Sequence, residues 1–157
     1  VENMFKREIE NIVSANISED GRKEIIDVES IAKRLNNMGV PNFKAETING
    51  LGKQECIDSC LNATFGAYED KIRPVRKQIM PVEKTMVLRL MDRAWQNHID
   101  VMSKLREGIH LRSYAQNNPL EAYIEEGYQL FEEMMNTISN DVVTFCNNLK
   151  IVLKEKE

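Results

Sequence analysis

The second half of the chain holds two long runs in which apolar or aromatic side chains recur every three or four residues. In the first run these positions are Val87, Met91, Trp95, His98, Met102 and Leu105. In the second run they are Leu120, Ile124, Tyr128, Phe131, Met135, Ile138, Val142, Phe145 and Leu149. This spacing is typical of the apolar seam between paired helices. The chain is therefore predicted to contain a long antiparallel two-helix hairpin. Its seam is predicted to include Trp95, His98, Met102, Tyr128 and Phe131.

The connection between the two arms is predicted to run from Gly108 to Asn118. Asn118 is a good N-cap, Pro119 suits the first helical position, and Glu121 can reach back to the cap. At 1.5 Å per residue, the second arm is expected to be about 50 Å long. A hairpin of this length is typical of a projecting finger or of a scaffold on which other domains pack.

The first half of the chain reads as shorter helices. An amphipathic helix is predicted over 2–16, ended by the polar stretch 18–21, and another from the N-cap Asp27 to Gly39. A third is predicted over 53–72. Pro74 and Pro81 interrupt the helical pattern and mark a boundary. We expect an all-α chain with a small helical subdomain over 1–73 and the hairpin over 74–157.

Net charge, the length of apolar runs and the cysteine count argue against several classes of function. The 157 residues carry a net charge of −4, which argues against nucleic acid as a partner. No apolar run approaches the roughly 18 residues of a membrane span. Three cysteines are too few for a disulfide framework and favour a reducing compartment. Because the sequence starts at Val1, we expect it to be a segment of a longer protein.

Catalytic and metal-binding patterns are weak. The stretch 50–54 (GLGKQ) resembles a phosphate-binding loop, but Thr47 stands where the motif needs glycine and Gln54 where it needs Ser or Thr. Cys56 and Cys60 lie one helical turn apart, and with His98 or His110 they offer too few ligands at zinc-site spacing. Buried thiols are the better interpretation. No catalytic residue, metal or cofactor is predicted in this chain.

The segment 105–119 mixes apolar, aromatic and basic side chains between two long helices. A connection of this kind is usually shorter and more polar. One interpretation is a loop tucked onto a neighbouring domain, with Ile109 and Leu111 as anchors. The other is a hairpin tip that touches a partner. The physical pattern alone leaves both open.

Three motifs point to a known family. The first is Met91-Asp92-x-x-Trp95-x-x-His98-Ile99. The second is Leu105-Arg106-x-Gly108-Ile109-His110-Leu111-Arg112-x-Tyr114-Ala115-Gln116-x-x-Pro119. The third is Tyr123-x-x-Glu126-Gly127-Tyr128-x-x-Phe131-x-x-Met134. Together they closely resemble the C-terminal helical region of the SecA family, the ATP-driven motors of bacterial preprotein export. The resemblance is dense from Val82 to Ile138. It implies a helical wing over 1–73 and a helical scaffold with a two-helix finger over 74–157, whose tip is about 108–118.

The resemblance also implies a role for the finger. In this family its tip points into the SecY channel, contacts the unfolded preprotein and helps to regulate the ATPase. By motif match, Tyr114 is the bulky tip residue. The residues expected to contact the channel or the preprotein are Tyr114, Arg112, Arg106, His110, Ile109 and Leu111.

Further expectations concern the longer protein. ATP and Mg would be bound by motor domains outside this segment, so the segment itself is expected to be non-catalytic. The partners implied are the SecY channel complex, the preprotein, the remaining motor domains and a possible second copy. The location implied is cytoplasmic, at the inner face of the cell membrane. An alternative from another class is a stand-alone helical interaction or adaptor module that shares only the hairpin.

Overall fold

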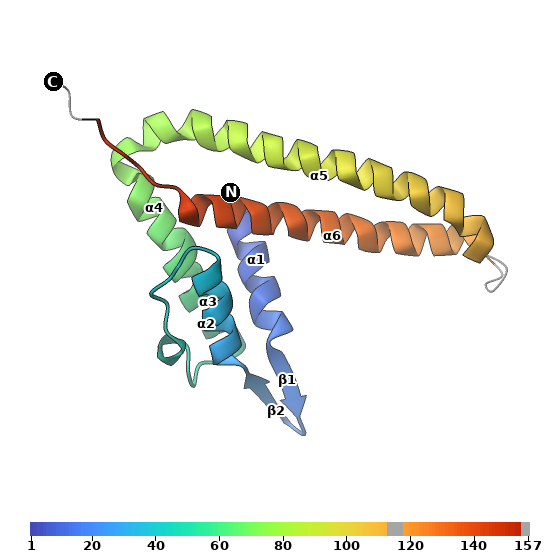
Figure 1. Ribbon diagram of the computed structural model, residues 1–157. Coiled ribbons are helices and arrows are strands. Elements are labelled where there is room, and N and C mark those ends of the chain that lie inside the picture. The colour runs from blue at the N-terminus through green and yellow to red at the C-terminus, as the bar shows by residue number, and fades with distance from the viewer. Residues whose placement is uncertain (113–117, 155–157) are drawn as a thin grey trace. The chain divides into compact units, whose positions relative to one another are not determined.

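The computed structural model of the chain describes residues 1–112 and 118–154 (Figure 1). The fold is mainly helical, which confirms the predicted all-α class. Two compact units can be distinguished: unit 1 contains Val1–Glu83 and Ser139–Glu157, and unit 2 contains Lys84–Ile138. The long helices α5 (Arg76–Arg112) and α6 (Pro119–Asn148) each contribute residues to both units. These units differ from the ranges 1–73 and 74–157 expected from sequence, because the end of α6 packs with the N-terminal helices.

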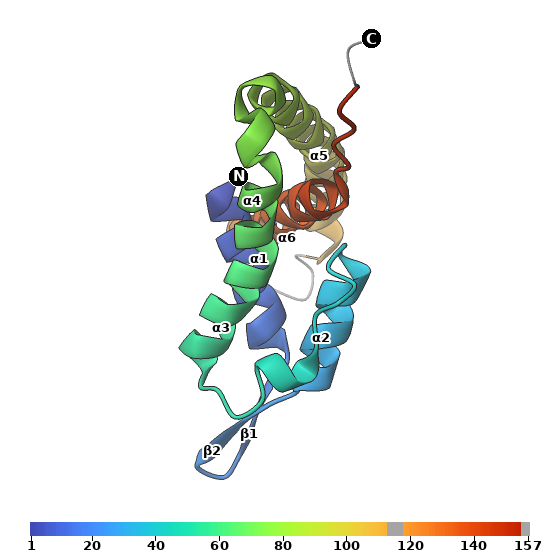
Figure 2. The same cartoon turned by 90° about the vertical axis from the view of Figure 1, so that its left-hand side faces the viewer.

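Unit 1 is built from short elements that precede α5. In chain order they are α1 (Glu2–Ala15), β1 (Ile17–Asp20), β2 (Lys23–Ile26), α2 (Val28–Asn37), the 3-10 turn η1 (Ala45–Thr47), α3 (Lys53–Leu61), the π-helical turn η2 (Asn62–Gly66), α4 (Ala67–Ile72) and the 3-10 turn η3 (Arg73–Val75). Figure 2 shows α3 running on into α4. The single helix predicted over 53–72 is therefore one helical run that contains a π-helical turn.

Local capping follows the sequence closely. The Asp27 carboxylate accepts a hydrogen bond from the Ser30 amide at 3.1 Å, as predicted for an N-cap. Hydrogen bonds from the Ser30 hydroxyl and amide lower the pKa of Asp27. Asn118 caps α6 in the same way, with its side-chain oxygen 3.4 Å from the Glu121 amide nitrogen. Pro81 does not interrupt the chain as expected, since α5 begins at Arg76 and continues through it.

A small antiparallel β-hairpin follows α1 and was not predicted. Its register pairs Ile17 with Ile26 and Asp20 with Lys23, which leaves a two-residue turn. Gly21, the first turn residue, has φ +66°, a conformation that glycine adopts without steric cost. The sequence signal for this hairpin is the Asp-Gly pair at 20–21, but the polar stretch that contains it predicts only the end of the first helix.

The core of unit 1 is apolar and fully enclosed. Its most deeply buried apolar side chains are Phe5, Ile9, Val13, Ile31, Leu35, Ile48, Cys56, Cys60, Val142, Val143 and Cys146. The Phe5 ring lies 5.2 Å from the Phe65 ring and 5.9 Å from the Tyr68 ring, measured between centroids. The last third of α6 is thus part of this core.

Polar contacts also hold the end of α6 within unit 1. The buried Glu8 carboxylate accepts a hydrogen bond from Asn140 at 2.9 Å and lies 3.5 Å from the Arg34 guanidinium. Gly39 ends α2 with φ +106°, and a Cβ there would lie 3.0 Å from Cβ of Asn147. Only glycine allows this backbone conformation and this close approach together.

Unit 2 is the antiparallel pair formed by the second part of α5 and the first part of α6. Its buried cluster consists of Leu105, Ile109 and Ala122, packed against the partly buried Met102, Tyr123 and Leu130. A Cβ at Gly127 would lie 3.1 Å from Cε of Met102, so this glycine lets the two arms pack closely. The helical hairpin predicted from the sequence is therefore present.

Candidate interaction surface on the helical hairpin

The structure corrects the register of the predicted seam. Trp95 is 49% exposed, Tyr128 is 67% exposed and Phe131 is 40% exposed, so these three aromatic residues are not buried between the arms. His98 and Met102 are half-buried where the arms meet. The residues that α6 does place against α5 include Ala122, Tyr123 and Leu130.

The reason for this difference is the width of the apolar face on α6. The helix carries one stripe at Leu120, Ile124, Tyr128 and Phe131, and a second at Tyr123, Leu130 and Met134. Both stripes have helical spacing, and a single partner helix covers only a narrow strip of its neighbour. Sequence spacing therefore identified the hairpin but not the stripe that faces α5.

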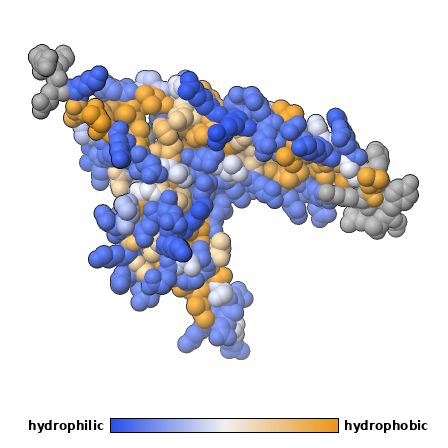
Figure 3. Space-filling view, in the orientation of Figure 1, coloured by the Kyte–Doolittle hydropathy of each residue, from blue (hydrophilic) through white to orange (hydrophobic). Residues whose placement is uncertain are grey.

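Eight apolar side chains that the hairpin leaves exposed form what we call the apolar stripe. They are Leu88, Met91, Trp95 and Ile99 of α5 and Leu120, Ile124, Tyr128 and Phe131 of α6. Figure 3 shows hydrophobic side chains among hydrophilic ones along these helices. Groups of large exposed apolar side chains often mark an interaction site.

Aromatic contacts connect the two halves of the apolar stripe. The His98 ring lies 5.6 Å from the Trp95 ring on the same helix and 6.0 Å from the Phe131 ring on α6, between centroids. A groove of about 330 Å³ opens beside them. It is lined by Trp95, His98, Ile99, Met102, Ser103, Arg106 and Tyr123. Its apolar walls suit a side chain from another helix better than a charged small molecule.

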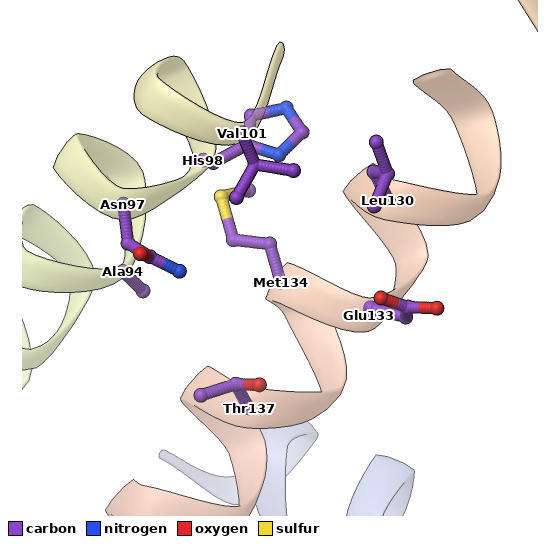
Figure 4. A pocket seen from close by; sticks show the side chains of 8 residues that line it. All are labelled: Ala94, Asn97, His98, Val101, Leu130, Glu133, Met134 and Thr137. Carbon is purple, nitrogen blue, oxygen red and sulfur yellow. The ribbon is translucent and has the colours of Figure 1, made fainter. Parts of the chain in front are cut away.

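A second pocket between the arms is smaller and more polar (Figure 4). Its volume is about 120 Å³. It is lined by Ala94, Asn97, His98 and Val101 of α5 and by Leu130, Glu133, Met134 and Thr137 of α6. The Met134 side chain reaches from α6 toward α5 (Figure 4). This volume suits a few water molecules, each of which occupies about 30 Å³ in the liquid, and is small for a substrate.

The predicted contact residues near the tip differ in their accessibility. Leu111 is 78% exposed and Arg106 is exposed, so both side chains are available to a partner. Ile109 is only 6% exposed and packs with Leu105 and Ala122, so it supports the arms rather than presenting a contact surface. Tyr114 and the side chains of His110 and Arg112 lie outside the described residues.

The loop before α3 is a poor fit to a nucleotide phosphate. Gly50 has φ +77°, and Gly52 is the N-cap residue of α3, so both glycines belong to the turn that leads into the helix. The Gln54 side chain donates a hydrogen bond to Asp58 at 3.0 Å and supplies no hydroxyl for Mg²⁺. The absence of a nucleotide site from this chain stays a prediction.

The three cysteines are buried thiols in the described structure. Burial raises the pKa of Cys56 and, together with the neighbouring Cys56, raises the pKa of Cys60 to about 12. Within residues 1–112 and 118–154, histidine, cysteine and carboxylate side chains do not gather in groups of three that could hold a metal ion. Because their pKa values are raised, the Cys56 and Cys60 thiols stay protonated and are not reactive nucleophiles near neutral pH.

The comparisons with known proteins identify the family. The SecA wing and scaffold domain family matches residues 1–150. The chain belongs to this family. The SecA protein translocase subunit of Halothermothrix orenii is 29% identical over 155 residues, which are 98% of this chain and 18% of that protein. The chain thus spans about a fifth of the length of this relative.

The family match extends over nearly the whole chain. The match covers the N-terminal helices as well as the two long arms, although the motifs noted in the sequence lie mainly between Val82 and Ile138. None of the helices in the described parts of the chain is long and apolar enough to cross a lipid bilayer.

Proposed function

We propose that this chain is the wing and scaffold part of an ATP-driven protein-export motor, and that its hairpin acts as a non-catalytic finger. The family match over residues 1–150 is the observation that carries this proposal. Export of preproteins, hydrolysis of ATP and binding of Mg²⁺ would then be properties of the longer protein. The chain would work at the cytoplasmic face of the membrane, beside the SecY channel.

The apolar stripe supports a scaffold role. Trp95 and Tyr128 expose large rings that a free surface helix would rarely carry together. In the full-length protein, we propose that other motor domains cover this stripe. Covering it would transmit changes in the motor domains to the hairpin, which is a physical basis for regulation of the ATPase.

The side chains near the tip of the hairpin are suited to contact with an unfolded preprotein. Leu111 and Arg106 are exposed on the last turns of α5, and Tyr114 follows in the connection. Aromatic and aliphatic side chains offer contact area that tolerates many sequences, as an unfolded preprotein requires. Arg106 adds guanidinium donors suited to carbonyl or carboxylate groups of the channel.

The experiment is preprotein translocation into vesicles that contain the SecY channel, driven by the full-length protein that carries this chain. Tyr114→Ala and Leu111→Ser are expected to reduce translocation several-fold, because each removes contact area at the tip. Tyr114→Phe is expected to retain most activity, since it keeps the ring. ATP binding should be unchanged in all three variants.

The matched control is Ile25→Ser on β2, an exposed aliphatic residue outside the hairpin. It should translocate at the unmodified rate. Normal translocation by both tip variants would contradict the proposed role of the tip. Failure of the unmodified full-length protein to drive translocation at all would contradict the export function itself.

A further inference from the structure

Two side chains of α4, one helical turn apart, each contact the base of one long arm. The Tyr68 hydroxyl donates a hydrogen bond to Oε2 of Glu83 at 2.6 Å, near the start of α5. The Lys71 ammonium donates to the main-chain oxygens of Cys146 at 2.8 Å and Asn147 at 3.1 Å, at the end of α6. All five residues belong to unit 1. The helix α4 therefore links the two long helices at their bases.

Lys71 caps the C-terminal end of α6, where the helix has no basic side chain of its own. The last carbonyl groups of any α-helix lack donors within the helix, and a cation near them is stabilising. The last turn of α6 contains no basic residue. Lys71, distant in sequence, provides both the donors and the positive charge.

These contacts are partly buried. Tyr68 is buried, and the Lys71 nitrogen lies 5.7 Å from the centroid of its ring. Burial lowers the pKa of Lys71 and raises the pKa of Tyr68. Breaking either contact would leave a partly buried polar group without its partner, which lowers stability.

Cys146 lies within the same cluster and gives it a chemical reporter. Its side chain is fully buried. Burial raises the pKa of the Cys146 thiol to about 11. While the cluster is intact, this thiol is both inaccessible and protonated, so alkylating reagents should modify it slowly.

We propose that α4 is a latch: Tyr68 and Lys71 hold the bases of α5 and α6 together, and release of Lys71 lets the last turns of α6 detach while the rest of unit 1 stays folded. This inference does not rest on the proposed role in export. It predicts local opening at one end of α6, as observed for the less stable segments of many proteins.

The test is the rate of alkylation of each cysteine by iodoacetamide at about pH 8, mapped by peptide mass spectrometry on the 157-residue chain. Lys71→Met is expected to speed the modification of Cys146 at least tenfold. Cys56 and Cys60 of α3 should keep their rates and serve as internal controls. Lys77→Met, a change at an exposed lysine of α5, should alter none of the three rates.

Faster alkylation of Cys146 in Lys71→Met would report better access of the reagent to the thiol. The Lys71 charge lowers the pKa of Cys146, so its loss slows the chemical step. Any gain in rate must then come from access to the thiol. Tyr68→Phe, which removes the bond to Glu83 and keeps the ring, is expected to give a smaller gain at Cys146. Lys71→Arg keeps the cation and should stay close to the unmodified rate.

Two results would overturn the latch. An unchanged Cys146 rate in Lys71→Met would show that the contact does not hold the end of α6. An equal rise at all three cysteines would show that the variant loosens unit 1 as a whole and that α6 has no separate opening.

Discussion

Units 1 and 2 are both mainly helical but use their apolar side chains differently. Unit 1 encloses Phe5, Ile9, Leu35 and Val143 completely. Unit 2 buries a short cluster near the tip and leaves Trp95 and other residues of the apolar stripe exposed. The difference teaches that unit 1 completes its own core, whereas unit 2 presents surface that another partner would have to cover.

The largest effect is expected from truncation in the core of unit 1. Phe5→Ala should lower the free energy of unfolding by about 3–5 kcal/mol, because it removes a fully buried ring that contacts Phe65 and Tyr68. Urea denaturation followed by circular dichroism measures this change. A loss under about 1 kcal/mol would mean that this core is not closed.

A smaller loss is expected at the junction of α2 with α6. Gly39→Ala should cost about 2–3 kcal/mol, because a side chain at φ +106° is strained and its Cβ would meet Asn147 and Asn148. Gly21→Ala on the β-hairpin is the control, since φ is also positive there but nothing lies within 4 Å. Equal losses in the two variants would remove the evidence for close packing of α6 on Gly39.

Trp95 gives the sharpest contrast with Phe5. Trp95→Ala should cost about 1 kcal/mol or less in this chain, because half of the ring is already in water. Acrylamide should quench the fluorescence of Trp95, the only tryptophan, efficiently in the folded chain. A loss of about 3–5 kcal/mol, as expected for a fully buried ring, would instead support the sequence prediction that Trp95 is buried between the two arms.

The smallest effect is expected at the tip. Tyr114→Ala should change the stability of this chain by no more than about 0.5 kcal/mol, because it lies outside both predicted apolar runs. Thermal denaturation checks this value. Unfolding of the variant chain would assign Tyr114 a structural role and would weaken its proposed role in transport.

Local rules made much of the fold predictable. The caps Asp27 and Asn118, the glycine at position 39 and the two long arms follow from short-range patterns that the structure retains. The β-hairpin was missed because its strands are only four residues each and mostly polar. Such strands lack the alternation that sequence analysis relies on.

The candidate surface was less predictable than the fold. Helical spacing shows that Trp95 and Tyr128 belong to apolar stripes, but two stripes on α6 compete for one neighbour. The contribution of Lys71 to the end of α6 joins residues far apart in sequence, which no local pattern reveals. Tertiary packing decides both which stripe of α6 faces α5 and which side chain caps the end of α6.

The most direct test of the contrast between the units is amide hydrogen exchange of this chain, resolved by residue. Amides of the unit 1 core outside α6, such as those of Ile9, Ile31 and Leu35, should exchange only through global unfolding. Amides of unit 2 around Trp95 and Tyr128 should exchange at least about tenfold faster, because few buried contacts protect those turns. Equally slow exchange in both units would contradict the account, since the hairpin would then be as well stabilised as unit 1.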